Sequence, residues 1–449
     1  MSSALPVAIE RVKIQNFRSI REVDLALPEF AVLVGPNGSG KTNFVQALAL
    51  LGEMLLRGTT EPIDSFGWDE LVRRGRKRAH HLLLGATVRV DLPRRGEPDA
   101  DAPMRIEIEI DLKKHPKLDT VVVAREHLKV IKGDAWLQLE VVGSELSVSQ
   151  EGTADLVHEL VPVRMARARP AGTEQGADPG KPKDPLSELQ AYFEPRVFDD
   201  DAGARFLRLL SLPRFYSPLL EAVTSACAVQ RLRLDATALR AMSSAHAALG
   251  GAGEGLAAVV AEIRGMDAKP KKEFLPILSA LQEVFPRVED VLPTRVGAGQ
   301  LILAFRERGV ATPFAQSSVS DGVLHALALL LGLAPSRRGR LGPRMGGLLA
   351  IEEPENAIHP WSIRVLLKRM QAAQRRQILL TTHSVEVVNQ VRKPASLLLC
   401  EATDDGTQIV AALDRESALV AIVRDTGEGL GDLWKSGTLG GVPGPEDDG

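Results

Sequence analysis

A glycine-rich segment near the start of the chain carries the residue types that bind phosphate. Residues 35–42 read Gly-Pro-Asn-Gly-Ser-Gly-Lys-Thr, with an apolar β-like run at 30–34 before them and a helical pattern over 43–56 after them. Glycines let successive backbone N–H groups turn toward one anion, and a helix start adds partial positive charge there. The segment matches a P-loop in its strand–loop–helix context, so we expect the chain to bind a nucleoside triphosphate.

The side chains of this segment predict which atoms hold the nucleotide and its metal. Lys41 is expected to reach the β- and γ-phosphates, and the Thr42 hydroxyl is expected to ligate Mg²⁺. ATP and Mg²⁺ are therefore the predicted cofactors. The predicted nucleotide-binding residues here are Gly35, Asn37, Gly38, Ser39, Gly40, Lys41, Thr42 and Asn43.

An apolar run that ends in two acids lies far along the chain. Residues 348–353 read Leu-Leu-Ala-Ile-Glu-Glu, the Walker B pattern. Parallel strands place their carboxyl ends at one edge of a sheet, where ligands bind. We expect Glu352 to hold the Mg²⁺ shell and Glu353 to orient and deprotonate the attacking water. A strand ending in a solvated acidic turn would show the same letters, but the P-loop upstream favours Walker B. A second apolar run, 378–382, ends beside His383.

Together these motifs resemble the ABC-type ATPases of the RecF/SMC branch. In that branch, the resemblance implies, a signature segment of one subunit closes over the ATP that another subunit holds. Ser317–Leu324 looks like this signature, with Ser-Asp-Gly where many relatives have Ser-Gly-Gly, although the same triplet alone is an ordinary helix cap. The resemblance implies nucleotide contacts from Ser320, Asp321 and Gly322, a catalytic switch role for His383, and a phosphate contact from Arg18. A surface arginine and a structural histidine are the alternatives for Arg18 and His383.

The resemblance covers roughly residues 1–60 and 300–435, and it has departures. The Glu-Glu pair of Walker B and the ending 431–437 look like the compact, stand-alone AAA-type ATPases related to the OLD family. Glu352 stands where Asp is usual, which lengthens the metal-binding arm by one methylene. The sequence does not place a Q-loop glutamine. Residues 43–319 lack sustained heptads, so no long coiled coil is expected.

The pattern of apolar residues predicts the elements that position these motifs. The expected fold is α/β, a P-loop NTPase of the ABC-head type with a mixed β-sheet core, an antiparallel β subdomain and an inserted helical lobe. We divide the chain into core residues 1–85, the β subdomain 86–185, the helical lobe 186–300 and core residues 301–449. Expected strands are 7–14, 22–27, 87–92, 104–111, 136–142, 301–305, 348–351, 378–382, 396–400 and 408–412. Expected helices of the lobe are 186–193, 202–210, 219–228, 237–249, 255–264 and 274–285.

Composition limits the partners and the compartment. The 449 residues carry 55 basic and 58 acidic side chains, so any contact with nucleic acid must be local. The densest basic cluster, residues 73–78, predicts a solvated turn or a phosphate-backbone contact. Cys227 and Cys400 show no disulfide or metal spacing and suit a reducing compartment. With no membrane-length apolar run and no signal-peptide core, we expect a cytoplasmic protein without a membrane partner.

The motifs predict an ATPase head that forms a homodimer around ATP and acts as a conformational switch on DNA or on a partner effector. The resemblance suggests DNA repair or antiphage defence, with a nuclease in a separate chain. The acids Glu401, Asp404 and Asp405 read as a hairpin tip rather than a built-in nuclease. A nucleotide-gated scaffold that does not hydrolyse ATP is the alternative, and the intact Glu353 favours the enzyme. A transporter ATPase is a third alternative, disfavoured by the missing Q-loop and the RecF-like arm around Arg18.

Overall fold

The computed structural model describes most of the chain, and the account below is restricted to that part. It comprises residues 7–73, 79–91, 103–115, 120–143, 145–152, 156, 218–297, 299–334, 347–373, 376–412 and 416–439. The predicted helices 186–193 and 202–210 and the basic residues 74–78 lie outside these ranges. Among the described helices, none combines the length and the apolar character that a membrane span requires.

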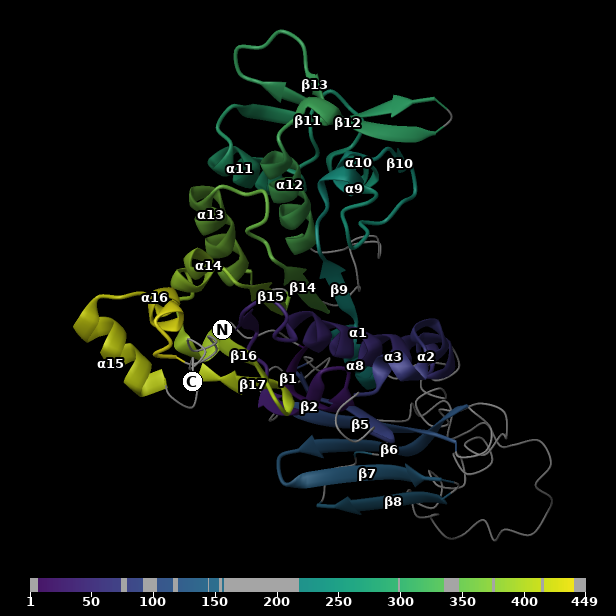
Figure 1. The fold of residues 1–449 in the computed structure, drawn as a ribbon. Helices are drawn as coiled ribbons and strands as arrows, with labels where there is room; N and C mark the ends of the chain where they lie inside the picture. The colour runs from purple at the N-terminus through teal and green to yellow at the C-terminus, as the bar shows by residue number, and fades with distance from the viewer. Residues whose placement is uncertain are drawn as a thin grey trace, which may run out of the picture.

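Five parallel strands from distant parts of the chain form the centre of the molecule (Figure 1). Their order is β16-β3-β15-β14-β9, and each is parallel to its neighbour. Strands buried on both faces read as continuous apolar runs, which is why the sequence predicts β3 and β15 with the right bounds. The strands are β3 (Phe30–Val34), β9 (Val229–Leu232), β14 (Leu348–Glu352), β15 (Ile378–Thr382) and β16 (Leu397–Thr403).

Strands that pair antiparallel, except for the parallel contact of β17 with β2, extend the same sheet beyond β16. The extension runs β17-β2-β1-β4-β5-β6-β7-β8 and occupies the lower part of Figure 1. Ile106, Ile108 and Ile110 alternate with charged residues and are at most 1% exposed, so one face of the extension belongs to the core. The strands are β1 (Val7–Phe17), β2 (Ile20–Ala26), β4 (His81–Val90), β5 (Met104–Lys114), β6 (Val121–Lys132), β7 (Ala135–Val142), β8 (Glu145–Glu151) and β17 (Gly406–Ala411).

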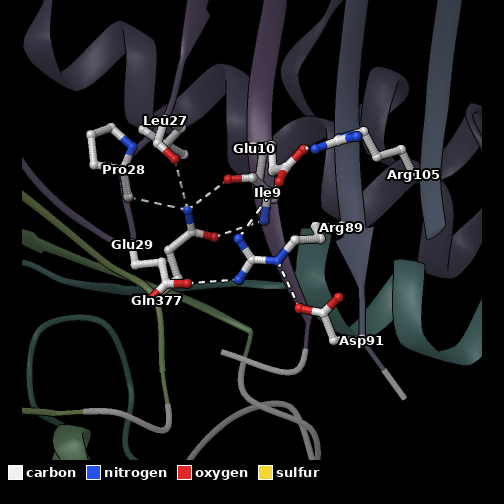
Figure 2. Close-up of polar contacts among 9 residues, drawn as sticks. All are labelled: Ile9, Glu10, Leu27, Pro28, Glu29, Arg89, Asp91, Arg105 and Gln377. Atoms are coloured by element: carbon white, nitrogen blue, oxygen red, sulfur yellow. Dashed lines mark hydrogen bonds and ion pairs between the residues drawn. The ribbon is translucent and has the colours of Figure 1, made fainter. Parts of the chain in front are cut away.

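Gln377 joins the antiparallel extension to the parallel core (Figure 2). Its side chain is buried directly before β15, where its Oε1 accepts from the Ile9 N–H at 2.9 Å and its Nε2 donates to the Ile9 carbonyl at 2.8 Å and the Pro28 carbonyl at 3.2 Å. Beside it, Arg89 donates to Glu29 at 2.7 Å. The register of β1 against β4 shifts just after Ile9, so the Gln377 amide supplies hydrogen bonds at that irregularity.

The face of the sheet on which α1 lies is covered by helices that follow the P-loop. Leu33 of β3 packs in one core cluster with Phe44 and Leu48 of α1 and with Val223 of α8. Burial raises the pKa of the Cys227 thiol at the end of α8 to about 12, which fits an unreactive core cysteine. The helices are α1 (Lys41–Arg57), α2 (Thr60–Phe66), α3 (Trp68–Leu71) and α8 (Pro218–Cys227).

The opposite face carries a second lobe of helices and a small antiparallel sheet, at the top of Figure 1. Val32 and Val34 of β3 point into this second cluster. The helix predicted over 237–249 is wrong beyond Arg240, because Ser243 and Ser244 pair with strand β12 instead. The elements are α9 (Ala236–Arg240), β10 (Ser243–Ser244), α10 (Leu256–Arg264), α11 (Leu275–Val284), β11 (Val288–Val296), β12 (Gln300–Glu307), β13 (Phe314–Ala315), η1 (Gln316–Ser318) and α12 (Asp321–Leu333).

The C-terminal helices complete the layers. Leu366 and Leu367 of α13 and Trp434 of α16 belong to the same cluster as α12. The remaining elements are α13 (Pro360–Gln371), α14 (Val385–Asn389), η2 (Pro394–Ser396), α15 (Glu416–Thr426) and α16 (Leu430–Lys435). The mixed sheet between helical layers confirms the predicted α/β class, while the boundaries at 85, 185 and 300 remain predictions.

Candidate nucleotide-binding site

The P-loop leaves the end of β3 and closes tightly against the neighbouring strands. Gly38 and Gly40 have φ of 80° and 106°, a backbone region that favours glycine. A side chain at Gly35 would collide with the Cys400 carbonyl of β16, and one at Gly40 would collide with Thr407 of β17. Gly35 is therefore required by the close approach of the β16 backbone, and Gly40 by its positive φ and by the Thr407 side chain.

Lys41, the first residue of α1, is folded back over the loop. Its Nζ donates to the Gly35 carbonyl at 2.7 Å and to the Pro36 carbonyl at 2.8 Å. Burial lowers the pKa of this ammonium group, and the carboxylates of Glu353 and Glu355 partly oppose that shift. The ammonium group therefore lies within electrostatic reach of the acids that end the Walker B strand.

Two polar side chains of the loop are placed where they could contact a ligand. The Ser39 hydroxyl oxygen is buried without a hydrogen-bond partner, and Asn37 is exposed at the tip. A buried hydroxyl without a partner is unfavourable unless a ligand supplies one. This orphaned oxygen, in a loop of backbone N–H groups at a helix start, fits an anion such as a phosphate.

The P-loop and the Walker B strand meet through one hydrogen bond. Thr42 Oγ1 donates to Glu352 Oε2 at 3.0 Å, because β14 and β3 end at the same edge of the parallel core. The Glu352 side chain is only 3% exposed, and its other oxygen accepts from Arg231. A hydroxyl and a carboxylate beside a phosphate loop fit Mg²⁺, which takes few protein ligands and completes its shell with water and phosphate.

Glu353 follows Glu352 but turns away from the strand. Its φ of 51° is unusual for a residue with a side chain, and such strain is often retained at functional sites. Its Oε2 accepts from Asn356 Nδ2 at 2.9 Å, and its Oε1 lies 3.7 Å from His383 Nδ1. The strand end therefore presents the Glu353 carboxylate and the His383 imidazole together, while their catalytic roles remain predictions.

A third carboxylate, which the sequence analysis did not single out, lies in the same group. Glu355 Oε1 accepts from Thr382 Oγ1 at 2.5 Å and lies 3.9 Å from His383 Nδ1. Its other oxygen is buried without a partner. Its position in the turn directly after the two Walker B acids is the feature of the sequence that could have identified it.

Arg18 lies on a strained turn between β1 and β2, with φ of 50°. Its Nη1 donates to Gln46 of α1, and burial together with the nearby charge of Arg231 lowers the pKa of the guanidinium. Asn43 also faces this turn, because its Nδ2 donates to Ser19 Oγ at 2.7 Å. Arg18 is thus held against the first turns of the P-loop helix.

The signature residues lie on the other lobe. Ser320 precedes α12, is exposed, and makes no capping bond with its side chain. Asp321 pairs with Arg240, which also donates to the Val319 carbonyl at 2.7 Å. Gly322 faces the Ala357 carbonyl. Within the described ranges, no hydrogen bond or ion pair joins residues 320–322 to residues 35–43 of the same chain.

Family models match both halves of this site. Residues 8–64 match a model described as "AAA ATPase domain", and residues 185–389 match one described as "AAA domain, putative AbiEii toxin, Type IV TA system". The first range contains the P-loop, and the second contains the signature, both Walker B acids and His383.

Curated relatives are similar over part of their length. The DNA replication and repair protein RecF of Renibacterium salmoninarum is 31% identical over 131 residues, which cover 28% of this chain and 32% of the relative. RecF of Acidothermus cellulolyticus is 34% identical over 132 residues, covering 28% and 34%. RecF of Vibrio vulnificus is 53% identical over 45 residues, covering 10% and 12%. The chain thus spans about a third or less of the length of these relatives.

Heads of SMC proteins are among the solved structures that the chain matches, at TM-scores below 0.5. An SMC head domain from Thermotoga maritima is 12% identical with a TM-score of 0.41, covering 90% of this chain and 98% of that chain. The SMC head bound to the C-winged helix domain of ScpA is 13% identical with a TM-score of 0.45, covering 90% and 97%.

The strand–loop–helix of the P-loop, the Walker B strand in the same parallel core and the two ATPase-domain matches define a P-loop NTPase of the ABC-head type. In keeping with the predicted resemblance, part of the chain is similar in sequence to RecF proteins.

Proposed function

We propose that this chain binds ATP with Mg²⁺ and hydrolyses it. The observation that carries the proposal is the hydrogen bond between Thr42 and Glu352, which joins the predicted metal ligands of the P-loop and Walker B. Directly after Glu352, the carboxylate of Glu353 lies near His383 at the same strand end. On the P-loop side of the site, the Ser39 hydroxyl, which has no partner, and the Lys41 ammonium supply hydrogen-bond donors for phosphate oxygens.

Each side chain has a defined task in this proposal. Lys41 exchanges the two loop carbonyls for phosphate oxygens, and backbone N–H groups of the P-loop hold the remaining phosphate charge. Thr42 and Glu352 would hold Mg²⁺, which would supply further positive charge at the phosphates. Glu353 orients a water molecule and takes its proton, while His383 fixes the carboxylate.

We further propose that a second copy completes the site. The exposed Ser320 hydroxyl is not used for capping, and residues 320–322 make no bond to the P-loop of their own chain in the described ranges. The Ser320 hydroxyl is therefore available to a nucleotide on a second copy, while Asp321 is held by Arg240. Closure around ATP and opening after hydrolysis would then form a conformational switch.

We propose the cellular process in which the switch acts from the names of the relatives and from the sequence resemblance. RecF relatives are named for DNA replication and repair, which supports a role on DNA. The sequence resemblance to ATPases related to the OLD family supports antiphage defence with a separate effector, such as a nuclease. A pull-down of the native complex, with identification of copurifying protein and nucleic acid, separates these settings.

A single-turnover measurement with a Glu353→Gln variant tests the catalytic proposal. We expect ATP affinity to stay near that of the wild type, while hydrolysis slows by a factor of about 10² or more because the base is lost and the shape is kept. The control is Glu145→Gln, an exposed position on β8. Hydrolysis by Glu353→Gln at the wild-type rate would exclude this base. A wild-type protein that binds ATP without turnover would instead support the nucleotide-gated scaffold.

A further inference from the structure

Strand β9 brings an arginine against the Walker B carboxylate. Building on the proposed function, we infer that Arg231 is a positioning residue, which fixes Glu352 so that its carboxylate can hold the metal shell at Thr42. β9 was not predicted from the sequence, and Arg231 matches no motif discussed above. The inference therefore rests on the pairing of β9 with β14 and on the contacts of these three side chains.

The contacts of Glu352 divide its two oxygens between two partners. Arg231 donates to Oε1 from Nη2 at 2.7 Å and from Nε at 3.2 Å. Oε2 accepts from Thr42 Oγ1 at 3.0 Å. Arg231 thus leaves the oxygen that faces the P-loop to Thr42 and fixes the direction of the carboxylate from the opposite side.

The register of the two strands explains how Arg231 reaches this position. Arg231 is paired with Ala350, and Leu232 with Ile351, in a parallel ladder. Ala350 and Glu352 lie on the same face of β14 because side chains alternate along a strand. The long side chain of Arg231 therefore extends past Ala350 to the carboxylate one step further along that face.

The length of the Glu352 side chain explains why the contact with Arg231 is needed. A glutamate has one more rotatable bond than the aspartate usual at this position, so its carboxylate needs a second contact to hold one orientation. A carboxylate that is 3% exposed also needs a nearby cation, since burying an unpaired charge is unfavourable. In the described ranges, Arg231 is the cation that forms an ion pair with Glu352.

The position of Arg231 separates this role from a purely structural ion pair. Its side chain is 32% exposed, unlike the buried pair of Arg264 and Asp290, in which the arginine side chain is 1% exposed. It also lies within electrostatic reach of Arg18, on the turn that packs against the P-loop helix. Arg231 thus borders the nucleotide edge of the sheet, where outer contacts of a metal ligand commonly change metal affinity 10- to 100-fold, an order-of-magnitude range.

The test separates metal binding from nucleotide binding. A non-hydrolysable ATP analogue is titrated into wild type and Arg231→Met, first in EDTA and then at fixed analogue with increasing Mg²⁺. We expect the affinity in EDTA to stay within about twofold, because the P-loop is intact, and the Mg²⁺ concentration for half-maximal effect to rise by about 10- to 100-fold. Arg233→Met, an exposed position just past β9, is the matched control and should resemble the wild type.

Two further variants keep the test decisive. Arg231→Lys retains the positive charge if the methionine variant does not fold, and it should still raise the Mg²⁺ requirement because an ammonium group cannot donate as a planar fork. In a Glu352→Gln background, Arg231→Met should add no further rise. An unchanged or lower Mg²⁺ requirement in a folded Arg231 variant would overturn the inference. A wild-type protein that binds no analogue under either condition would reject the proposed function itself, and the inference with it.

Discussion

At the scale of single residues, the site is organised by charges that are satisfied within the chain. Lys41 donates to two carbonyls of its own loop, and Glu352 is held by Thr42 and Arg231. Among the described side chains of the site, an oxygen of Ser39 and an oxygen of Glu355 are buried without a partner, as is Arg18 Nε. A nucleotide with its metal would supply partners for such oxygens. The same residues can therefore serve both the nucleotide-free and the nucleotide-bound state.

Lys41→Ala tests the phosphate-binding role at this scale. We expect the variant to lose detectable ATP binding in a calorimetric titration, because a charge-assisted contact to the phosphates is removed. Lys435→Ala, an exposed position at the end of α16, should bind ATP like the wild type. Near-normal affinity of the Lys41→Ala protein would contradict the P-loop assignment.

The sequence could predict those site residues that are adjacent in the chain. Lys41 and Thr42 stand in one motif, and Glu352 and Glu353 end one apolar run, so neighbouring letters reveal each pair. Arg231 could not be found in this way. Its relation to Glu352 arises only when β9 pairs with β14, a fact that no local spacing encodes.

At the scale of elements, four of the five strands of the parallel core were predictable, and β9 was not. A strand buried on both faces is a continuous apolar run, and residues 378–382 form β15 as expected. The four residues of β9 read Val-Gln-Arg-Leu, directly after a helix, and lack such a run. In the lobe, Ala and Leu over 237–249 suggested a helix, but pairing of Ser243 and Ser244 with β12 prevailed over local propensity.

The hydrogen bonds by which Gln377 joins the antiparallel extension to the parallel core lead to a prediction about stability. Gln377→Ala removes both partners of the Ile9 backbone groups and leaves them buried. We expect the free energy of unfolding to fall by about 2 to 4 kcal/mol, since each unsatisfied buried group costs on the order of 1–3 kcal/mol. Denaturant unfolding measures the loss, with Gln408→Ala, exposed on β17, as control. Equal free energies of unfolding for the two variants would show that the Gln377 hydrogen bonds do not stabilise the fold.

At the scale of the whole molecule, the two lobes place different motifs at one edge. α12 precedes β14, and its last turn contacts the sheet through Gly332, which lies against Leu232 and Leu349. At the other end of this 13-residue helix, Gly322 faces the carbonyl of Ala357, which follows the end of β14, so the start of α12 lies toward the edge where the strands end. This edge carries both the P-loop and, separately, the signature, an arrangement that suits two copies facing each other.

Mixing two inactive variants tests that arrangement. A Lys41→Ala chain retains its signature, and a Ser320→Arg chain retains its P-loop, so each homodimer should be inactive because all of its sites are damaged. A heterodimer has one doubly damaged site and one intact site. Random pairing makes about half of the dimers heterodimers at equal mixing. We expect ATPase activity to return in part, with a maximum near equal proportions, because one complete set of groups is enough for phosphoryl transfer.

The controls decide how the result is interpreted. Light scattering establishes that dimers form, and Ser149→Arg, an exposed position on β8, should remain active alone and show no maximum when mixed with the wild type. Activity of the Ser320→Arg protein alone would exclude the signature, because an arginine at that position should block closure over ATP. No activity at any ratio, with heterodimers present, would mean that the two sites fire only together or that residues 320–322 do not serve the partner. Recovery would establish that the phosphate loop of one copy and the signature of the other form one site.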